Sequence, residues 1–461
     1  MTGEGLVCKL KNIQPIDGAD KIVQANLFGE TVIISKDYQE GQLGILFDIE
    51  TQLSEDFAKE NNLYRHNNLN KDTTKTGYLE DNRRVRPIKL RGVKCSAMWM
   101  PIESLEYTSK VPTKNKLPSE GTQITDWNGF EICKKYVRPT RGSHKNNKVA
   151  KKVQQVLHFA EHLDTDQLMR NLHRINIGDK IIVTSKLHGT SCRVGLLPTL
   201  PRNRFKRWWY EFWNKKLPYK MVVGSRHALK HVEGQAIDNK DSYYDDDIWT
   251  ESAYKNFHGK LMPGETVYYE IVGFLPSGSP IMPTHSNDKL KKFLEPQEYK
   301  EFIDKFGKET VFHYGCNVRQ GWTQKPDLYN KNLLSSLETI GEYKIFVYRI
   351  TLTTENGQAI DLSWRQLVNR CEQLGVNSVS EIFSDLITKE NIDKYRDESF
   401  WQFHTEKDDP HFPQHLNEGI CVRIENAGLR PLVFKNKRYA FKVLENIIKD
   451  NDNIVDLEET N

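Results

Sequence analysis

The sequence predicts an α+β protein with a small N-terminal β-barrel and a larger second domain of antiparallel sheets flanked by helices. Three observations predict this class. Residues 6–105 alternate short β-rich runs with turn signals, a basic run follows at 134–152, and the rest of the chain mixes apolar strands with helical stretches. The length of 461 residues fits two to four domains at about 150 residues each.

The N-terminal domain is predicted from β-rich runs at 6–13, 21–27, 31–35 and 43–47, with a turn at Asp17-Gly18. The following stretch, 83–101, combines six basic residues with an apolar run that ends at Trp99 and Met100. A basic strand face on a small barrel is how OB modules bind nucleic acid, and a charge-protected edge strand is the alternative. We therefore predict an OB-like domain over 1–135, with Arg91 as an RNA-contact residue.

The basic run at 134–152 holds eight Lys or Arg residues and no Asp or Glu. We interpret 136–152 as a linker, either simply solvated or able to clamp a phosphate backbone. The second domain then covers 153–461. Its first element is predicted to be a helix from Val153 to Arg174, and no internal repeat interrupts the domain.

A second basic block, 202–220, has seven Lys or Arg residues against one Glu, with seven aromatic residues among them. This composition fits base stacking with backbone contacts, a membrane-surface helix, or an aromatic pack whose charges reach solvent. Arg207 and Trp208 are the RNA-contact candidates here. The acidic triplet Asp245 to Asp247 is interpreted as an exposed loop.

Several functional classes are disfavoured by composition. The formal net charge is only +4, and no apolar run approaches the ~20 residues that a bilayer span requires. Seven scattered cysteines fit free thiols in a reducing compartment, so we expect an intracellular protein with no membrane contact. His313 and Cys316 are at most half a zinc site, and the signatures of zincins, P-loop proteins and Rossmann folds are missing.

Polar residues interrupt strands that are otherwise apolar in the second domain. Lys186 ends a β-branched run and precedes a turn, and further polar positions follow downstream: Ser225, Arg226, Glu270, Glu418, Lys435 and Lys437. A strand predicted at 343–351 carries the aromatic residues Phe346 and Tyr348 on one face. Burial of charged groups in strands is costly unless they serve a shared site. We therefore expect these side chains to converge.

In this order the motifs resemble the covalent nucleotidyltransferase superfamily of ATP-dependent nucleic-acid ligases and mRNA capping enzymes. That superfamily has Lys-x-Asp-Gly, a Ser-Arg element, two glutamate strands, an aromatic strand and a terminal Lys-x-Lys. The RNA-ligase family with an N-terminal OB module is the most similar, because 83–101 also resembles its N-terminal segment. The resemblance implies a nucleotidyltransferase domain of the ATP-grasp-type ligase class at 153–461.

The resemblance also implies a function and a set of roles. The protein would be an ATP-dependent RNA ligase that joins 3′-OH and 5′-phosphate ends. Lys186 would attack the ATP α-phosphorus to form lysyl-AMP, and AMP would then pass to a 5′-phosphate before a 3′-hydroxyl seals the break. The other implied nucleotide contacts are Leu187, His188, Gly189, Arg226, Glu270, Phe346, Glu418, Lys435 and Lys437.

Within that set, Glu270 and Glu418 would hold the ribose and the water shell of a divalent metal. Phe346 would stack on adenine, with Tyr348 as the alternative if the alignment of that strand is shifted by two residues. Lys435 and Lys437 would contact phosphates and assist catalysis.

His188 occupies the place of the usual aspartate. This change weakens the anionic site for Mg²⁺ and is better tolerated by Mn²⁺, so the expected metal is Mg²⁺ or Mn²⁺.

A lysine attacks only as a neutral amine, and at a pKa of ~10.4 about one molecule in a thousand is neutral at pH 7. We expect Lys435, Lys437 and the metal to disfavour the charged form of Lys186 by repulsion. The same cations would stabilise negative charge on the phosphoryl oxygens as pyrophosphate leaves.

Two alternatives remain. DNA ligases and capping enzymes usually carry a second OB domain after Lys-x-Lys, and the 19 residues after Lys442 leave no room for one. The other alternative is a non-catalytic RNA- or tRNA-binding protein with a degenerate transferase domain, which His188 favours.

The expected partner is RNA, as a nicked duplex or a broken strand, and a monomer is favoured.

Overall fold

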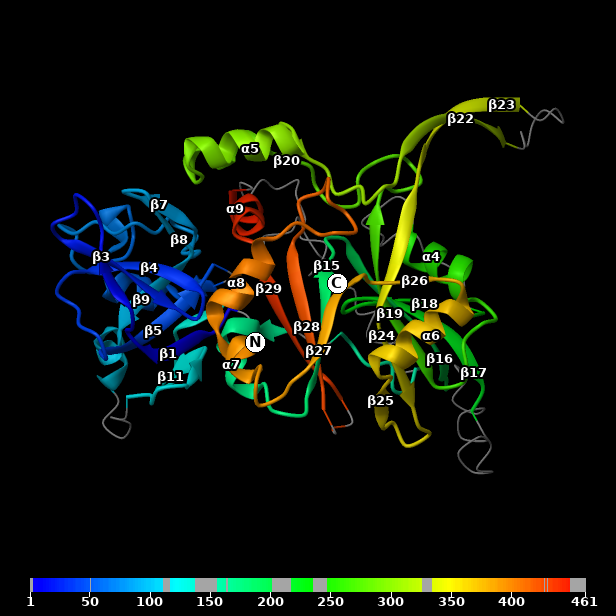
Figure 1. The fold of residues 1–461 in the computed structure, drawn as a ribbon, viewed down its shortest axis with the longest axis horizontal. Coiled ribbons are helices and arrows are strands. Elements are labelled where there is room, and N and C mark those ends of the chain that lie inside the picture. Colours follow the sequence, from blue (N-terminus) through cyan, green and yellow to red (C-terminus); the bar gives the residue numbers. More distant parts are fainter. Residues whose placement is uncertain are drawn as a thin grey trace.

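A computed structural model describes residues 3–49, 51–110, 117–136, 156–162, 165–200, 217–234, 247–325, 334–426, 428 and 430–447. The predicted linker at 136–152 lies almost entirely outside these residues, as do Arg207 and Trp208. Figure 1 shows the N-terminal β-domain at one end and the sheets of the second domain beside it, which confirms the predicted fold class.

The N-terminal domain is built on a four-stranded sheet in the order β10-β1-β5-β9 and a three-stranded sheet in the order β2-β3-β4. The strands of the first are β1 (Gly5–Lys9), β5 (Leu43–Asp48), β9 (Ala97–Pro101) and β10 (Gln123–Ile124). Those of the second are β2 (Ile13–Pro15), β3 (Ile22–Leu27) and β4 (Glu30–Ser35). Alternating residues of β3 and β4 are buried against Leu46 and Trp99, so one apolar core joins the two sheets.

Short elements complete this domain. α1 (Glu55–Glu60) begins where the Ser54 side chain accepts a hydrogen bond from the Phe57 backbone N–H, and it buries Phe57 under the four-stranded sheet. The others are β6 (Thr51–Leu53), η1 (Asn67–Leu69), β7 (Ile88–Leu90), β8 (Val93–Cys95), η2 (Ile102–Lys110), β11 (Asp126–Trp127), β12 (Phe130–Glu131) and β13 (Cys133–Lys135). We propose the domain boundary after Lys135, because β13 still pairs with β6.

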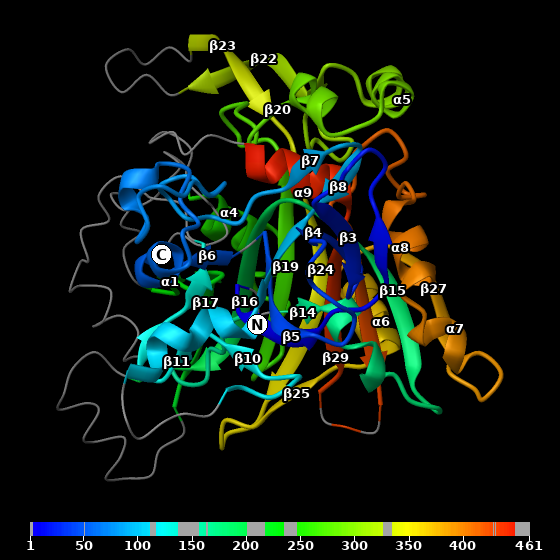
Figure 2. The ribbon, with the colours of Figure 1, turned by 90° about the vertical axis from the view of Figure 1, so that its left-hand side faces the viewer.

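Two sheets form the second domain. The five-stranded sheet has the order β14-β29-β28-β15-β27, with β14 (Asp166–Gln167), β15 (Lys180–Lys186), β27 (Glu381–Leu386), β28 (Gly419–Glu425) and β29 (Leu432–Lys437). The seven-stranded sheet has the order β18-β17-β16-β19-β24-β25, and β26 (Asn377–Ser378) also pairs with β24. Its other strands are β16 (Thr190–Pro198), β17 (Tyr219–Ser225), β18 (Leu229–Val232), β19 (Glu265–Gly273), β24 (Tyr343–Thr353) and β25 (Ala359–Asp361). Figure 2 looks onto the N-terminal domain, with these sheets behind it.

Helices flank the sheets, as predicted. They are η3 (Leu168–Arg170), η4 (Leu172–Arg174), α4 (Ile248–Phe257), η6 (Asn287–Lys292), α5 (Pro296–Phe306), α6 (Trp364–Leu374), α7 (Ile392–Arg396), α8 (Glu398–Glu406) and α9 (Tyr439–Ile447). Asp247, the described member of the acidic triplet, caps α4 by accepting from the Thr250 backbone N–H. This residue therefore has a structural role.

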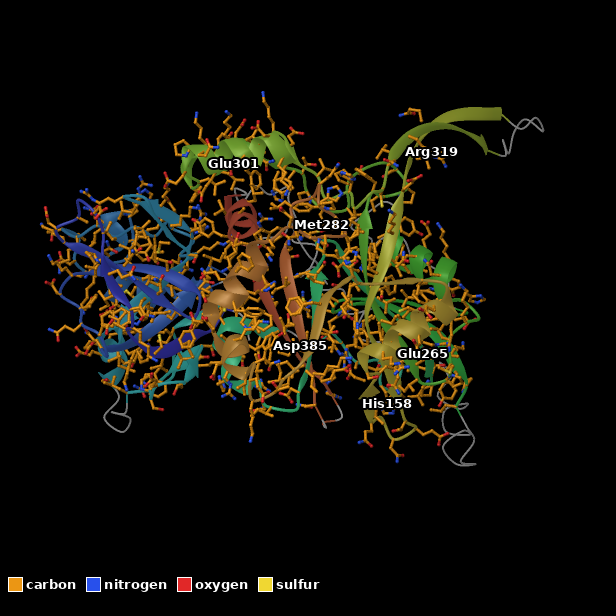
Figure 3. All side chains as sticks on the ribbon, viewed as in Figure 1. His158, Glu265, Met282, Glu301, Arg319 and Asp385 are labelled. Carbon is orange, nitrogen blue, oxygen red and sulfur yellow. The ribbon has the colours of Figure 1, made fainter. Side chains whose placement is uncertain are left out.

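A long hairpin extends away from the body, formed by β22 (Val318–Lys325) and β23 (Leu334–Gly341), with Arg319 at its base (Figure 3). The small strands β20 (His285–Ser286) and β21 (Glu309–Thr310) pair just before it in the chain. The hairpin ends directly before β24, so its second strand leads straight into the larger sheet.

The helix predicted from Val153 to Arg174 is wrong for the described residues. Residues 156–162 are not helical, and β14 and the two short 3₁₀ helices η3 and η4 occupy 166–174. Tertiary contacts override the local pattern: Leu157 N–H donates to Pro198 O, and the Tyr268 hydroxyl donates to Ala160 O. The β-rich runs predicted at 21–27, 31–35 and 43–47 are confirmed as β3, β4 and β5, and the run at 6–13 contains most of β1 and the first residue of β2.

The two domains contact each other through paired charges rather than through a linker alone. The cross-domain pairs are Arg170 with Asp48 at 3.3 Å, Lys89 with Glu295 and Lys94 with Glu298 at 2.7 Å each, and Lys442 with Glu30. Two of the basic residues in 83–101 are therefore engaged by α5 and the turn before it. This corrects the expectation that the whole basic face is available to nucleic acid.

Candidate nucleotide-binding site

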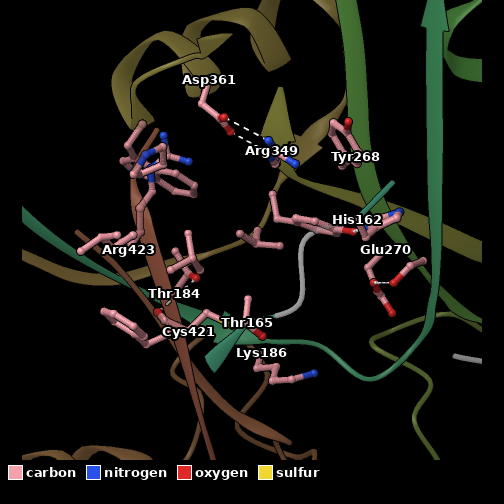
Figure 4. A pocket seen from close by; sticks show the side chains of 18 of the residues that line it. His162, Thr165, Thr184, Lys186, Tyr268, Glu270, Arg349, Asp361, Cys421 and Arg423 are labelled. Carbon is pink, nitrogen blue, oxygen red and sulfur yellow. Dashed lines mark hydrogen bonds and ion pairs between the residues drawn. The ribbon is translucent and has the colours of Figure 1, made fainter. Parts of the chain in front are cut away.

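A cavity of about 370 Å³ lies between the two sheets of the second domain (Figure 4). Its walls come from β15 on one side and from β19 and β24 on the other, with β28 and β29 closing the far end. Four of the predicted site residues line it: Lys186, Leu187, Arg226 and Glu270. The cavity thus joins residues from strands far apart in the sequence.

Lys186 is held at the end of a buried strand. The register of β15 against β28 pairs Lys186 with Gly419, which brings the preceding residue, Glu418, next to the lysine. The Lys186 ammonium Nζ lies 2.7 Å from Glu418 Oε1, and only 1% of the Glu418 side chain is exposed. The nucleophile candidate and one predicted metal carboxylate therefore form a buried ion pair.

A second lysine shares the same carboxylate. Lys437 Nζ lies 3.5 Å from Glu418 Oε1 and 3.0 Å from Glu445 Oε2 of α9. Burial by itself raises the pKa of the Glu418 carboxyl, but Lys186 and Lys437 outweigh it and hold that pKa well below its ordinary value. Glu418 is therefore an anion placed between two cations.

Gly419 allows this close arrangement. Its φ is +147°, and a Cβ there would lie 2.1 Å from the Asn436 carbonyl oxygen of β29. Any larger residue would push apart the strands that carry Glu418 and Lys437.

Lys435, two residues before Lys437 on β29, is buried and pairs across from Cys421.

His188 contacts the ion-pair cluster from the turn after Lys186. Its ring packs edge-on against Phe312 and Phe441, at centroid distances of 4.6 and 4.8 Å, and its Nδ1 lies 3.5 Å from Glu418 Oε2. The His188 backbone N–H donates to the Tyr314 hydroxyl at 2.8 Å. The histidine is thus packed firmly beside the carboxylate.

Glu270 lies on β19, across the cavity from β15. The pairing of Ser191 with Glu270 places the serine hydroxyl 3.1 Å from Glu270 Oε2, to which it donates. Gly189 permits the turn to approach β19, because a Cβ there would lie 2.3 Å from the Ile271 carbonyl oxygen. The turn after Lys186 and the Glu270 strand are therefore in close contact.

Two observations bear on a divalent cation. Glu418 Oε2 is buried and accepts no hydrogen bond within the described parts of the chain. In the same parts, no three or more His, Cys, Asp or Glu side chains gather as a direct ligand set, and all seven cysteines are free thiols. The unused oxygen of Glu418 has the chemistry of a ligand for a hard cation.

The aromatic wall of the cavity differs from the first choice made from sequence. Phe346 does not line the cavity: it is 6% exposed and packs edge-on against Phe412 in the main core. Tyr348, the alternative two residues later, does line it. Of the two aromatic candidates, Tyr348 is therefore the one that the structure places at the cavity.

A β-bulge in β24 explains why Tyr348 lines the cavity although Phe346 does not. Tyr268 pairs with Arg349 and Tyr269 with Val347, so Tyr348 is an extra residue with no partner on β19. The bulge directs both Tyr348 and Arg349 to the cavity, which Tyr268 also lines. Arg349 is fixed by two hydrogen bonds to Asp361, of 2.5 and 3.0 Å (Figure 4).

Sequence reasoning missed several residues of this site. Tyr268 could have been found, because it lies two residues before Glu270 and shares its face of the strand. Ser191 and Tyr314 gave no signal, because they act through hydrogen bonds with residues distant in sequence. His162 also lines the cavity and was hidden by the incorrect helix prediction.

The predicted RNA contacts are placed as follows. Arg91 is exposed, with φ of +49°, in the tight turn between β7 and β8. Arg207 and Trp208 lie outside the described residues. No described helix is long and apolar enough to cross a membrane.

Comparisons with known proteins support the same architecture. A family model described as an OB-fold domain matches residues 6–102. No curated protein matches the sequence.

Among solved structures, an RNA ligase of Naegleria gruberi is similar in several states. A variant with ATP and Mn matches with 14% identity and a TM-score of 0.51 over 95% of this chain and 98% of that chain. A variant with AMP and Mn gives 14% and 0.52 over 95% and 97%, and the ligase with PPi gives 14% and 0.52 over 96% and 98%. The chain has the fold of these RNA ligases, with an OB-fold domain at its N-terminus.

Proposed function

We propose that this protein is an ATP-dependent RNA ligase in which Lys186 becomes adenylylated. The observation that carries the proposal is the buried cluster of Lys186, Glu418 and Lys437, at a cavity between two sheets. The fold shared with RNA ligases supports the choice of reaction. The similar structures with ATP, AMP and Mn support ATP and a divalent cation as the cofactors.

In this proposal the nucleoside occupies the cavity. Tyr348 stacks on adenine, replacing Phe346 in that role, and Glu270 holds the ribose with its position fixed by Ser191. Leu187, His188 and Gly189 shape the turn beside the α-phosphate, and Arg226 contacts the nucleotide from the residue directly after β17. Lys435 and Lys437 contact the phosphates.

The charge state of Lys186 determines when it reacts. The 2.7 Å ion pair with Glu418 favours the ammonium, which has no lone pair for attack. The expected repulsion from Lys437 is offset in this state, because Glu418 lies within ion-pair distance of both lysines. Activation therefore requires Glu418 to exchange the lysine for another cation.

A divalent cation, Mg²⁺ or Mn²⁺, would supply that charge and would neutralise phosphate oxygens when bound. The residues fit it: Glu418 offers its unused Oε2 and Glu270 a second carboxylate, and magnesium in nucleotide sites commonly combines one or two carboxylates with phosphates and water. With Glu418 engaged by a bound cation, Lys437 and Lys435 would repel the charged form of Lys186 and would favour the neutral amine.

The chemistry proceeds in three steps. The Lys186 amine forms a P–N bond to the α-phosphorus as the bond to pyrophosphate breaks, and the amine proton is lost to solvent. A 5′-phosphate oxygen then displaces the lysine and takes AMP. Finally a 3′-hydroxyl attacks the adenylated 5′-phosphate and releases AMP, which depends on holding both ends in line.

RNA is the proposed partner, held as a nicked duplex or as broken ends. The OB-fold domain, with Arg91 exposed at the β7–β8 turn, is the described surface suited to this role. The segments around Arg207 and Trp208 and the linker at 136–152 are further proposed contacts.

Label transfer from α-labelled ATP in the presence of Mg²⁺ or Mn²⁺ tests the first step. We expect covalent label on the wild type, none on Lys186→Ala, and full label on Lys180→Ala, which removes an exposed lysine from the other end of the same strand. A folded wild type that takes no label would favour the non-catalytic RNA-binding alternative.

A nick-sealing panel with ribose or deoxyribose on each side of the break tests the substrate. An RNA ligase acting at nicks is expected to require ribose at the 3′-hydroxyl side. Sealing of an all-DNA nick at an equal rate would instead support a DNA-ligase function.

A further inference from the structure

A second carboxylate holds Lys437, and it comes from a different element than Glu418. Lys437 is the last residue of β29, and Glu445 lies in α9, which begins two residues after that strand. The Lys437 ammonium donates to both carboxylate oxygens of Glu445, at 3.3 and 3.0 Å, and lies 3.5 Å from Glu418 Oε1. Of these two carboxylates, Glu445 is therefore the closer.

One face of α9 is turned towards the ion-pair cluster. Phe441 and Glu445 are four residues apart, so they lie on the same side of the helix. The Phe441 ring packs edge-on against His188 at a centroid distance of 4.8 Å, and Lys437 Nζ lies 5.6 Å from the centroid of the same ring. The ring and the carboxylate thus approach Lys437 from one helix face.

Contacts with neighbouring elements fix the position of α9. Lys442 forms an ion pair with Glu30 of β4, in the N-terminal domain. The backbone N–H of Arg438, directly before the helix, donates to the carbonyl oxygen of Glu418 at 2.9 Å. A lysine side chain has many rotamers, so a carboxylate on a helix held in this way restricts where the ammonium that it binds can lie.

Lys437 is close enough to Lys186 for both to reach one phosphoryl group. The two ammonium groups approach the same oxygen, Glu418 Oε1, at 2.7 Å for Lys186 and 3.5 Å for Lys437, so their nitrogens are separated by no more than the sum of these distances. A phosphorus in line for attack lies about 3–3.5 Å from the attacking nitrogen. The oxygens of such a phosphoryl group are therefore within reach of Lys437.

We propose that Glu445 is a positioning residue that holds the Lys437 ammonium against the triphosphate during transfer of AMP to Lys186. In that step the Lys186 amine bonds to the α-phosphorus as the bond to pyrophosphate breaks, and Lys437 offsets the negative charge on the phosphoryl oxygens. With Glu418 engaged by a bound cation, the place of Lys437 would depend on Glu445. The inference rests on the proposed function, since it takes Lys437 as a phosphate contact.

The rate of label transfer from α-labelled ATP to the full chain tests the inference, followed at increasing ATP concentrations in excess over protein. Glu445→Gln removes the charge and keeps an acceptor, whereas Glu445→Leu removes both with little change in helix propensity. Glu406→Gln is the matched control. Glu406 accepts from the Tyr439 backbone N–H at 2.8 Å and pairs with Arg438, so this change affects the start of the same helix and leaves the Lys437–Glu445 pair in place.

We expect the maximal rate to fall about tenfold for Glu445→Gln and up to about a hundredfold for Glu445→Leu, because a donor that is no longer preorganised stabilises the transition state less. The ATP concentration at half-maximal rate should change by less than about twofold, since the contact strengthens as charge develops. Glu406→Gln should keep the wild-type rate. Circular dichroism checks that each variant is folded, and Glu445→Gln suffices for the test if the Leu variant is not.

Equal maximal rates for the wild type and both Glu445 variants would overturn the inference. An equal loss for Glu406→Gln would also overturn it, because the effect would then come from α9 as a whole, and so would a change confined to the half-maximal ATP concentration.

The proposed function fails separately from this role. If the folded wild type takes no label, both proposals fall. If the wild type is labelled and the Glu445 variants match it, only the role of Glu445 is wrong.

Discussion

Glu418 is the residue on which the charge balance of the site depends. Replacing it by Gln removes the carboxylate from Lys186 and leaves Lys437 with its ion pair to Glu445, which should lower the free energy of unfolding by ~3 kcal/mol at pH 7. The variant should also fail to take label from ATP. Thermal unfolding at pH 7 measures the first effect, and Lys180→Ala should leave both properties unchanged.

The pH dependence of stability follows from the same carboxylate. Lys186 and Lys437 hold the pKa of Glu418 well below its ordinary value despite burial, while an unfolded glutamate titrates near ~4.3. The unfolded chain therefore binds a proton first as the pH falls, so the stabilisation is complete above about pH 5 and is lost below it. The Tm difference between wild type and Glu418→Gln should shrink between pH 7 and pH 3, and a constant difference would contradict this assignment.

Tyr348 and Phe346 can be distinguished by matched substitutions to Leu. Tyr348→Leu should raise the KM for ATP in the adenylylation step by about ten- to a hundredfold, because base stacking contributes ~1–3 kcal/mol. Phe346→Leu should mainly lower Tm, since its ring is part of the core. The reverse pattern would show that Phe346 contacts the nucleotide.

At the level of single residues, the sequence was informative where a charge interrupts an apolar strand. Lys186, Glu270 and Glu418 stand out for this reason. The structure places Lys186 and Glu270 at one cavity and pairs Glu418 with Lys186 beside it. The sequence gives no such signal for His162, because this histidine lies in a polar segment and does not interrupt an apolar strand. Its position depends on hydrogen bonds and ring contacts with β19 and β24, which only the folded chain reveals.

Among the elements, the β28–β29 pair is the most sensitive to backbone change. Gly419→Ala places a Cβ 2.1 Å from the Asn436 carbonyl oxygen at a φ of +147°, so we expect a loss of stability well above ~1 kcal/mol and loss of label transfer. Gly375→Ala is the control. Gly375 ends α6 at a φ of +71° with no atom within 4 Å of its Cβ position, so it should cost only ~1 kcal/mol. Equal effects on Tm would contradict this comparison.

The elements that sequence patterns failed to predict share a physical cause. The bulge at Tyr348 depends on the register between β19 and β24, and a one-residue insertion leaves no trace in local hydrophobicity. The segment 156–162 has a helical pattern but gains more from bonds to Pro198 and Tyr268 than a short helix would provide. The buried strands were predictable because continuous or alternating apolar runs define them locally.

For the whole molecule, the domain interface should be most sensitive to the loss of one partner of the buried ion pair between Asp48 and Arg170. Their side chains are 6% and 7% exposed, so Asp48→Asn leaves a buried unpaired cation and should cost ~3–5 kcal/mol. The exposed pair Lys9 and Glu120 is the control, and Glu120→Gln should change stability by at most about 1 kcal/mol. Thermal unfolding checks the stability, and small-angle scattering should show a larger radius of gyration only for Asp48→Asn.

The interface could not be read from the sequence, although its residues are conspicuous. Lys89 and Lys94 were interpreted as part of a nucleic-acid surface, yet their partners Glu295 and Glu298 lie more than 200 positions away in the chain. The sequence shows which residues are charged, but it does not show which of them form ion pairs in the folded chain. The overall class and the order of the domains were predictable, because each depends on patterns within a short stretch.

The pairing of Lys186 with Glu418 has a consequence beyond the reaction itself. Primary amines in proteins are carbamylated by cyanate, glycated by sugar aldehydes and acylated by mixed anhydrides, because the unprotonated amine attacks each of these electrophiles. The ion pair with Glu418 keeps Lys186 protonated and therefore protects it from these modifications. The amine of Lys186, the proposed nucleophile, should therefore stay unmodified for long periods in the absence of nucleotide.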